Sequence, residues 1–147
     1  MPVRMASICA DLRSIPEILP AGSFQVCVSN PPYFTDGFKS PVHGRSRHTD
    51  HCCAEDLFRS AQWALKFGGD LFLVQKPDRL AELCHLAVSH QLEPKHLMLL
   101  RHREKSPVSL ILLHCRKGAK PGLKLTEAAL HHPDGTPTDY YNAIYHL

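Results

Sequence analysis

The stretch Phe24-Gln25-Val26-Cys27-Val28-Ser29-Asn30-Pro31-Pro32-Tyr33-Phe34 joins a short apolar run to a rigid turn. Alternating apolar residues and recurring valines are typical of a half-buried β-strand. The two prolines have no N–H to donate and fix their own φ, so the strand must stop at Asn30. They also restrict the residues before them to extended backbone. The sequence therefore predicts an Asn30 carboxamide held at a strand's carboxyl end, with the Tyr33 ring three residues further on.

This turn has the groups needed to hold a planar molecule that carries an NH2 group. The Asn30 carboxamide oxygen and a backbone carbonyl of the proline pair can each accept one N–H. The Tyr33 ring can stack on the flat face, as aromatic side chains do with unpaired or flipped bases. When both N–H groups donate hydrogen bonds to these acceptors, the nitrogen becomes a better nucleophile. The alternative is a rigid turn without a chemical role, but an apolar strand running into Asn-Pro-Pro-Tyr favours function.

The run from Phe24 to Phe34 resembles motif IV of the class I S-adenosylmethionine-dependent methyltransferases that modify exocyclic or amide nitrogens. Further segments match one branch of these enzymes in the same order. They are Asp36-Gly37, the basic cluster Arg45–His48, the presumed helix end Leu65–Gly69 and the tail Lys117–Gly122. That branch is similar to the bacterial tRNA adenine-N6 methyltransferases that act on the adenosine beside the anticodon of a valine tRNA. The match covers nearly all of this chain, whereas the chain covers only the later part of such an enzyme.

The resemblance implies S-adenosylmethionine as cofactor, tRNA as substrate and a set of site residues. The implied catalytic residues are Asn30, Pro31, Pro32 and Tyr33. The implied cofactor contacts are Asp11, Leu12 and Asn30. On the residues alone, Asp11 is an equally good cap for the short helical segment that follows it.

The segment Thr35–Asp50 is the most basic part of the chain, and it has no helical or strand periodicity. So long a connection is typical of a functional loop, here one that closes over the target base, although a solvated loop explains it equally well. Charges on the rim of a later hairpin could also touch phosphates. The candidate RNA contacts are Phe34, Lys39, Arg45, Arg47, His48, Arg101 and Lys105.

Hydrophobic periodicity predicts an α/β fold over the whole chain. The expected strands are Met5–Cys9, Phe24–Val28, Asp70–Gln75, His96–His102, Val108–Cys115 and Leu123–Leu125. The expected helices are Cys52–Phe67, Asp78–His90 and a last helix that Thr138 caps and that runs through Tyr145. The link Arg103–Pro107 is so short that it permits only an antiparallel pair. We expect the C-terminal portion of a Rossmann-like class I methyltransferase sheet, with parallel strands ending in an antiparallel hairpin. One partial domain would span residues 1–147, with residues 116–147 as its C-terminal extension.

The amino-acid composition is that of a folded domain, and it does not distinguish between possible functions. The 147 residues are 44% hydrophobic and 21% charged, and the formal net charge is only +3. This charge is compatible with RNA binding but is no argument for it. The apolar runs are too short to cross a bilayer, and no signal peptide follows the first residues, so the cytoplasm is the expected location.

The six cysteines form no C-x-x-C pair. Cys9, Cys27 and Cys115 fall in apolar, strand-like runs and are expected to be buried thiols. One cluster is rich in metal-binding residue types but lacks a second pair of ligands, so no metal is predicted. The cluster consists of His48, His51, Cys52 and Cys53.

Two features that such an enzyme needs are missing from the sequence. These are a glycine-rich loop after the first strand and an acidic residue at the end of the second, which hold the cofactor. None of the eight glycines lies in a strand-Gly-x-Gly-helix context. A segment before Met1, or a partner chain, would have to supply both features. The strand Met5–Cys9 would then have no neighbour, and the isolated chain is expected to have an open sheet edge and low stability.

Two alternative functions remain open. Glutamine-amide methyltransferases of release factors share the Asn-Pro-Pro-Tyr sequence, although the loop and tail that follow it here argue against them. A non-catalytic remnant that binds RNA weakly, or has no activity, is supported directly by the missing glycine-rich loop.

Overall fold

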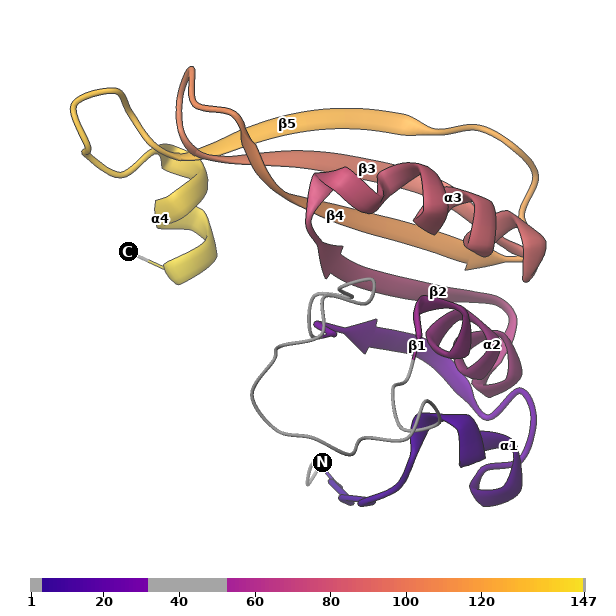
Figure 1. The fold of residues 1–147 in the computed structure, drawn as a ribbon. Coiled ribbons are helices and arrows are strands. Elements are labelled where there is room, and N and C mark those ends of the chain that lie inside the picture. Colours follow the sequence, from indigo (N-terminus) through magenta and orange to yellow (C-terminus); the bar gives the residue numbers. More distant parts are fainter. Residues whose placement is uncertain (1–3, 32–52, 147) are drawn as a thin grey trace, which may run out of the picture.

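The computed structural model describes residues 4–31 and 53–146, which form a five-stranded mixed sheet with helices (Figure 1). The strands lie in the order β1-β2-β4-β3-β5. They are β1 (Phe24–Ser29), β2 (Leu65–Gln75), β3 (Leu92–Arg103), β4 (Val108–Lys117) and β5 (Lys124–His131). The helices are α1 (Ile15–Ile18), α2 (Ala54–Ala64), α3 (Leu80–Ser89) and α4 (Asp139–Tyr145). Two short 3-10 helices cover Leu12–Ser14 and Pro77–Arg79. No helix in the described ranges is long and apolar enough to span a membrane.

Four strands of the sheet run in one direction, and β4 runs against them. The pairs β1–β2 and β3–β5 are parallel, whereas β4 is antiparallel to both β2 and β3. The carboxyl ends of β1, β2, β3 and β5 therefore point to the same end of the sheet, on the left in Figure 1. The predicted α/β sheet with parallel strands and an antiparallel hairpin is confirmed.

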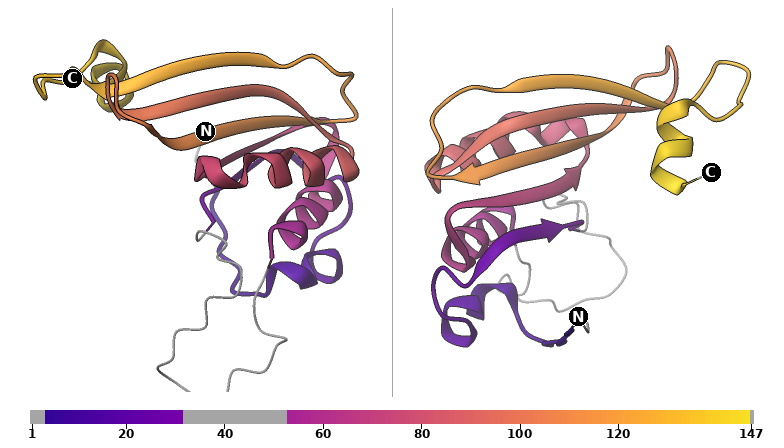
Figure 2. Two further views of the ribbon diagram at one scale, coloured as in Figure 1. Left: turned by 45° about the horizontal axis from the view of Figure 1, so that its top comes forward. Right: turned by 180° about the vertical axis from the view of Figure 1, so that it is seen from behind.

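Helices α2 and α3 cover one face of the sheet, as the left panel of Figure 2 shows. Alternate residues of the central strands point towards these helices and are almost fully buried, including Leu71 of β2 and Leu113 of β4. Phe58 of α2 and Leu83 of α3 complete this core and have no exposed surface. Burial of each large apolar side chain stabilises the fold by about 1.5–3 kcal/mol.

The other face of the sheet is not covered by α2 or α3 (Figure 2, right panel). Along β1, Val26 and Val28 alternate with Cys27, which points to the covered side. Val28 is 79% exposed, and its neighbour on β2, Phe72, is 42% exposed. Apolar side chains therefore face solvent across the parallel pair β1–β2.

A polar cluster lies beside these apolar residues on the open face. Asp70 of β2 accepts hydrogen bonds from His114 Nε2 at 2.7 Å and from Arg116 Nε at 2.9 Å. The His114 ring stacks on Phe72, with their centroids 4.5 Å apart. Burial raises the pKa of Asp70, but the hydrogen bonds from Arg116 and His114 outweigh it, so the pKa lies below its usual value.

The helix predicted over Cys52–Phe67 ends earlier than expected, because its last residues belong to β2. The helix stops at Ala64, and Leu65 already has extended backbone (φ −76°, ψ 139°) and pairs with the start of β1. Lys117 Nζ donates to the carbonyl oxygens of Gln62 at 2.5 Å and Leu65 at 2.8 Å. A lysine on β4 thus satisfies carbonyls that the end of a helix leaves free.

The strand predicted over Met5–Cys9 is wrong. Residues 4–11 pair with no strand of the described ranges 4–31 and 53–146, and Met5 and Ile8 are exposed. Without a neighbouring strand, this segment gains no ladder hydrogen bonds and so has no reason to form a strand. Cys9 is exposed rather than buried for the same reason, whereas Cys115 is buried as predicted. The open edge of the sheet lies at β1, which pairs only with β2 among the described residues.

The C-terminal part confirms most of the predicted elements and corrects one. The helix predicted over Asp78–His90 and the strands over His96–His102 and Val108–Cys115 are present, with differences at their ends. The last strand is much longer than the predicted Leu123–Leu125, because β5 pairs in parallel with β3 over almost its whole length. The predicted cap of α4 is confirmed, since Thr138 Oγ1 accepts a hydrogen bond from the N–H of Tyr141 at 3.2 Å.

Candidate functional site

Asn30 directly follows the last residue of β1, at the carboxyl end of the strand. The parallel register pairs Ser29 with Leu73 of β2, so the position of Asn30 is fixed next to the end of that strand. The Asn30 side chain is exposed, and it makes no hydrogen bond within the described residues. In open α/β sheets, ligands bind at the carboxyl ends of the strands. The carboxamide is therefore available to a ligand at the end of the sheet where one is expected.

Most residues predicted to surround Asn30 lie outside the described residues. Pro31 is described and is half-buried. The site residues outside are Pro32, Tyr33, Phe34, Lys39, Arg45, Arg47 and His48. The roles given to them remain predictions. In the cysteine- and histidine-rich cluster only Cys53 is described, and its thiol donates to a carboxylate oxygen of Asp56 at 3.2 Å.

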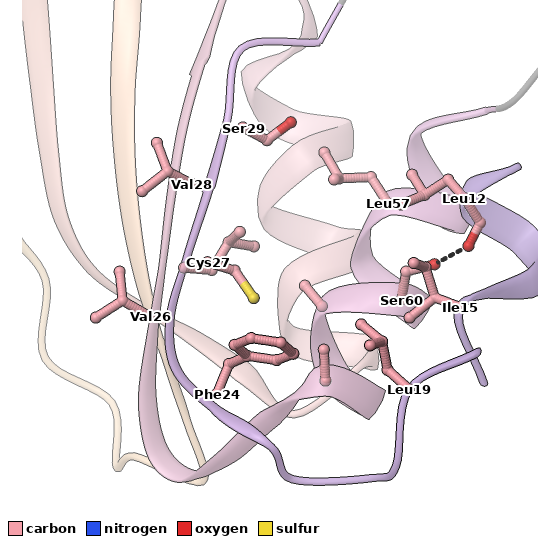
Figure 3. A pocket seen from close by; sticks show the side chains of 13 residues that line it. Leu12, Ile15, Leu19, Phe24, Val26, Cys27, Val28, Ser29, Leu57 and Ser60 are labelled. Carbon is pink, nitrogen blue, oxygen red and sulfur yellow. Dashed lines mark hydrogen bonds between the residues drawn. The ribbon is translucent and has the colours of Figure 1, made fainter. Parts of the chain in front are cut away.

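An apolar groove of about 300 Å³ lies on the covered side of β1, between this strand, α2 and the segment Leu12–Leu19 (Figure 3). Phe24 and Cys27 point into the groove from β1, and Leu57 faces it from α2. Among the described residues that line it, Ser29 and Ser60 are the only polar side chains and none is charged. The groove therefore suits a flat apolar group rather than an ion.

Two hydrogen bonds hold the segment Leu12–Leu19 against α2. Ser60 Oγ donates to the carbonyl oxygen of Leu12 at 2.7 Å, and Trp63 Nε1 donates to that of Leu19 at 2.9 Å. As a result Leu12, predicted to lie beside the cofactor, lines the same groove as Ser29, the residue before Asn30. The fold thus brings one predicted cofactor contact, Leu12, into a groove that is also lined by the residue directly before another, Asn30.

Asp11 acts as the helix cap that the sequence left open as an alternative. Its carboxylate accepts a hydrogen bond from the backbone N–H of Arg13 at 2.8 Å and pairs with the Arg13 guanidinium at 2.5 Å. These bonds lower the pKa of Asp11 to about 2, so the group is ionised at neutral pH. The side chain remains 46% exposed, and its contact with a cofactor stays a prediction.

The two hairpin residues predicted to contact RNA differ in their surroundings. Arg101 is half-buried, and its Nη1 donates to the carbonyl oxygen of Ser106 at 2.6 Å while Nη2 lies 3.7 Å from Glu127. Arg101 therefore stabilises the hairpin itself. Lys105 is exposed at the tip of the hairpin, in the left-handed backbone region with φ 64°.

Sequence comparison gives a consistent set of relatives, although no family model matches the chain. The chain is 29% identical over 133 residues to tRNA1(Val) (adenine(37)-N6)-methyltransferase from Bacteroides fragilis, covering 87% of this chain and 56% of that protein. It is 27% identical over 123 residues to the protein of the same name from Aeromonas hydrophila, covering 82% and 52%. The chain is similar to tRNA1(Val) adenine-N6 methyltransferases. The predicted resemblance is confirmed, and the chain spans about half the length of the curated relatives it matches.

Structural comparison agrees with this similarity at the level of the fold. A predicted O-methyltransferase from Agrobacterium tumefaciens superposes with a TM-score of 0.74 at 20% sequence identity. The match covers 93% of this chain and 60% of that one. The sheet and its helices therefore have a methyltransferase-like fold over nearly the whole chain.

The described residues fit only one part of the cofactor that the resemblance implies. The apolar walls of the groove suit a flat adenine ring. The methionine end of S-adenosylmethionine carries a carboxylate, an ammonium and a sulfonium, which need polar or charged partners. In the described part of the chain, the lining of the groove has no charged residue and no glycine that would let the backbone approach closely. These residues do not form a complete cofactor site.

The groove could not be recognised from the sequence, because its walls are apolar residues of the kind that normally form a core. Leu57, Ala61 and Ala64 lie on the apolar stripe of α2, which suggested packing against the sheet. One feature of the sequence did point to one wall of the groove: Asp11 caps a short helix directly after it. That short helix forms this wall, held next to α2 by the hydrogen bond from Ser60 to Leu12.

Proposed function

We propose that this chain supplies the base-binding part of an N-methyltransferase that acts on the exocyclic amine of an adenosine in tRNA. The observation that carries the proposal is the exposed Asn30 carboxamide at the carboxyl end of β1, which has no hydrogen-bond partner within the described part of the chain. It supports this function because the relatives that match most of the chain are named tRNA1(Val) (adenine(37)-N6)-methyltransferases. The substrate is then the adenosine next to the anticodon of a valine tRNA, and a cytoplasmic location fits that substrate.

Asn30 and the prolines would act by positioning the amine. The carboxamide oxygen of Asn30 accepts one N–H of the adenine amine, and a carbonyl of Pro31 or Pro32 accepts the other. Proline fixes the backbone, so these acceptors do not need to reorganise during the reaction. Tyr33 stacks on the base and keeps it out of its own stack. The proton released by the amine leaves to solvent or to a backbone acceptor.

The methyl donor of the proposed reaction is S-adenosylmethionine, which supplies an electrophilic methyl group. Of the implied contacts, Leu12 lines the groove that suits its adenine ring, and Asp11 and Asn30 each lie next in sequence to a lining residue. We propose that the polar contacts for its methionine end come from a segment or partner chain beyond these 147 residues. In this view residues 1–147 are one partial methyltransferase domain, and residues 116–147 are its C-terminal extension.

A chimera provides the direct test. This chain replaces the matching 56% of the Bacteroides fragilis relative, and radiolabelled methyl transfer to valine tRNA is measured. Asn30→Ala is expected to lower turnover on the order of 100-fold, with little change in tRNA affinity, because the lost acceptor acts on the reacting amine. Val88→Ala, an exposed residue of α3 away from Asn30, serves as the control and leaves turnover unchanged.

Two results would contradict the proposal. The first is a folded chimera that methylates a release factor on glutamine and leaves tRNA unmodified. The second is equal turnover of Asn30→Ala and the unsubstituted chimera.

A second candidate function is a non-catalytic RNA-binding chain, which the uncharged groove favours. In that case the 147-residue chain binds tRNA but shows no binding of S-adenosylmethionine in equilibrium dialysis, even at millimolar concentration. The chimera separates the two functions, since a non-catalytic chain would not restore methyl transfer to it.

A further inference from the structure

The end of the sheet that carries Asn30 also carries a projecting part, on the left of Figure 1. Gln75, the last residue of β2, pairs with Ile111 of β4, which pairs with Leu99 of β3. Strand β3 continues from there to Arg103. Four further residues at about 3.4 Å each carry the hairpin about 14 Å past the end of β2. We call residues 100–107 and 129–146, which include α4, the projecting lobe.

Four aromatic rings form a continuous row across the projecting lobe. The ring centroids of His102 and His131 are 5.0 Å apart, those of His131 and Tyr141 are 5.2 Å apart, and those of Tyr141 and Tyr145 are 4.6 Å apart. The two inner rings are half-buried and fix α4 against β5. The two outer rings are exposed, with Tyr145 at 58%. Rings held in this way can stack on further planar groups at little entropic cost, as base-binding aromatic side chains do.

The charge at the hairpin tip is positive. Arg103 and Lys105 are exposed, and neither makes an ion pair within residues 4–31 and 53–146. The acidic residue between them, Glu104, is paired with a histidine nitrogen at 3.0 Å. Asp134, in the loop that leads to α4, accepts hydrogen bonds inside its own turn. Two cations therefore remain free to contact phosphates next to the aromatic row.

We propose that the aromatic row, with Arg103 and Lys105, binds unpaired nucleotides of the RNA loop whose target base enters the site at Asn30. This inference rests on the function proposed above. Three strand spacings separate β1 from β3, which is about 14 Å, and both carboxyl ends lie at the same end of the sheet. A folded RNA loop can therefore contact the row and Asn30 at once. Unpaired nucleotides are favoured over a duplex, because stacking needs base faces that a duplex hides.

Fluorescence anisotropy of the 147-residue chain tests the aromatic row. The probe is a fluorescein-labelled RNA hairpin with the valine anticodon loop, and the comparison probe is the same stem as a blunt duplex. Tyr145→Ala or His102→Ala is expected to weaken hairpin binding about 5- to 100-fold, the range of one lost stacking contact. Phe67→Ala is the matched control, because this ring is 82% exposed at the amino end of β2, away from the lobe. Circular dichroism of each variant checks that the fold is retained.

A salt titration of the same chain tests the two cations. Lys105→Ala is expected to lower the slope of log affinity against log salt by about 1, because one phosphate contact is lost. Lys66→Ala, an exposed lysine at the other end of the sheet, leaves the slope unchanged. An unchanged slope in Lys105→Ala would overturn the phosphate contact.

Three results would overturn the aromatic row as an RNA site: no hairpin binding, equal affinity for hairpin and duplex, or full affinity in both Tyr145→Ala and His102→Ala. This failure is distinct from that of the proposed function. A chimera that methylates valine tRNA with unchanged affinity in those two variants leaves the function standing and removes the row. A chimera that binds the hairpin through the row but transfers no methyl group leaves the aromatic row standing and removes the proposed function.

Discussion

The two faces of the sheet carry similar apolar residues in very different surroundings. On the face covered by α2 and α3, Leu71 and Leu113 are almost fully buried. On the open face, Phe72 lies directly after Leu71 in the same strand and is 42% exposed, and Val28 beside it is 79% exposed. Both faces carry large apolar side chains along β1 and β2, although the open face also carries the polar cluster of Asp70, His114 and Arg116. Among the described residues, α2 and α3 pack against one face only.

This difference indicates that the open face of β1 and β2 is built as an interior surface. Parallel strand pairs occur almost only where both faces of a sheet are covered. Antiparallel strands tolerate solvent on one face, and the β3–β4 half of the molecule accordingly shows fewer exposed apolar side chains.

The largest expected effect on the free energy of unfolding is the difference between a phenylalanine on the covered face of the sheet and one on the open face. Phe58→Ala in the covered core should lower the free energy of unfolding by about 3–5 kcal/mol, because it leaves a cavity. Phe72→Ala on the open face should cost only about 1 kcal/mol, the value of its stacking on His114. Urea denaturation of both variants measures the two values. Equal losses would mean that the open face is packed in solution.

A smaller effect is expected for Asp70, which holds the polar cluster on the open face. Its pKa is lowered, so the carboxylate stabilises the fold above its unfolded pKa of about 3.9 and loses this contribution as pH falls through the lower folded value. Asp70→Asn should lower the free energy of unfolding by about 1 kcal/mol at neutral pH, since Arg116 is half exposed. The difference should shrink in acid. The exposed Asp78→Asn is the control, and an Asp70→Asn effect that is independent of pH would contradict the assignment.

The smallest effect on stability is expected at the open edge itself. Val28→Lys should change the free energy of unfolding by less than about 0.5 kcal/mol, because the side chain is already exposed. It should nevertheless reduce self-association of the chain, since a charge on an apolar edge strand opposes pairing. Sedimentation velocity measures the association. Val88→Lys, on the exposed side of α3, should leave it unchanged, and a similar reduction in both variants would argue against β1 as the contact.

The sequence predicts the strands and helices of the sheet's interior well, and it predicts poorly what happens at the ends and edges of the sheet. Strands such as Val108–Cys115 and the helix over Asp78–His90 carry local periodicity that their packing satisfies, so they appear as predicted. Met5–Cys9 has the residues of a strand but no partner, and pairing is a property of the neighbour rather than of the segment. The same reason explains β5, whose length is decided by the edge of β3 that it joins.

One part of the candidate site could be predicted from the sequence and another part could not. The position of Asn30 could be predicted because proline chemistry ends the strand locally, and the structure places it at the end of β1 as expected. The groove and the aromatic row could not be predicted, because each is assembled from segments that are distant in sequence. In the row, His102, His131 and Tyr141 come into contact only after β3, β5 and α4 have packed together. Sequence patterns carry no information on such meetings until the topology is known.

The contact of Lys117 with the end of α2 offers a chemical reporter of the fold. Its ammonium group is held by two carbonyl oxygens, whereas the amines of Lys66 and Lys105 are exposed. An acylating reagent should therefore modify Lys66 and Lys105 quickly and Lys117 only when α2 separates from β4. The lag in the mass shift of the Lys117 peptide would time that separation without any substrate, cofactor or RNA.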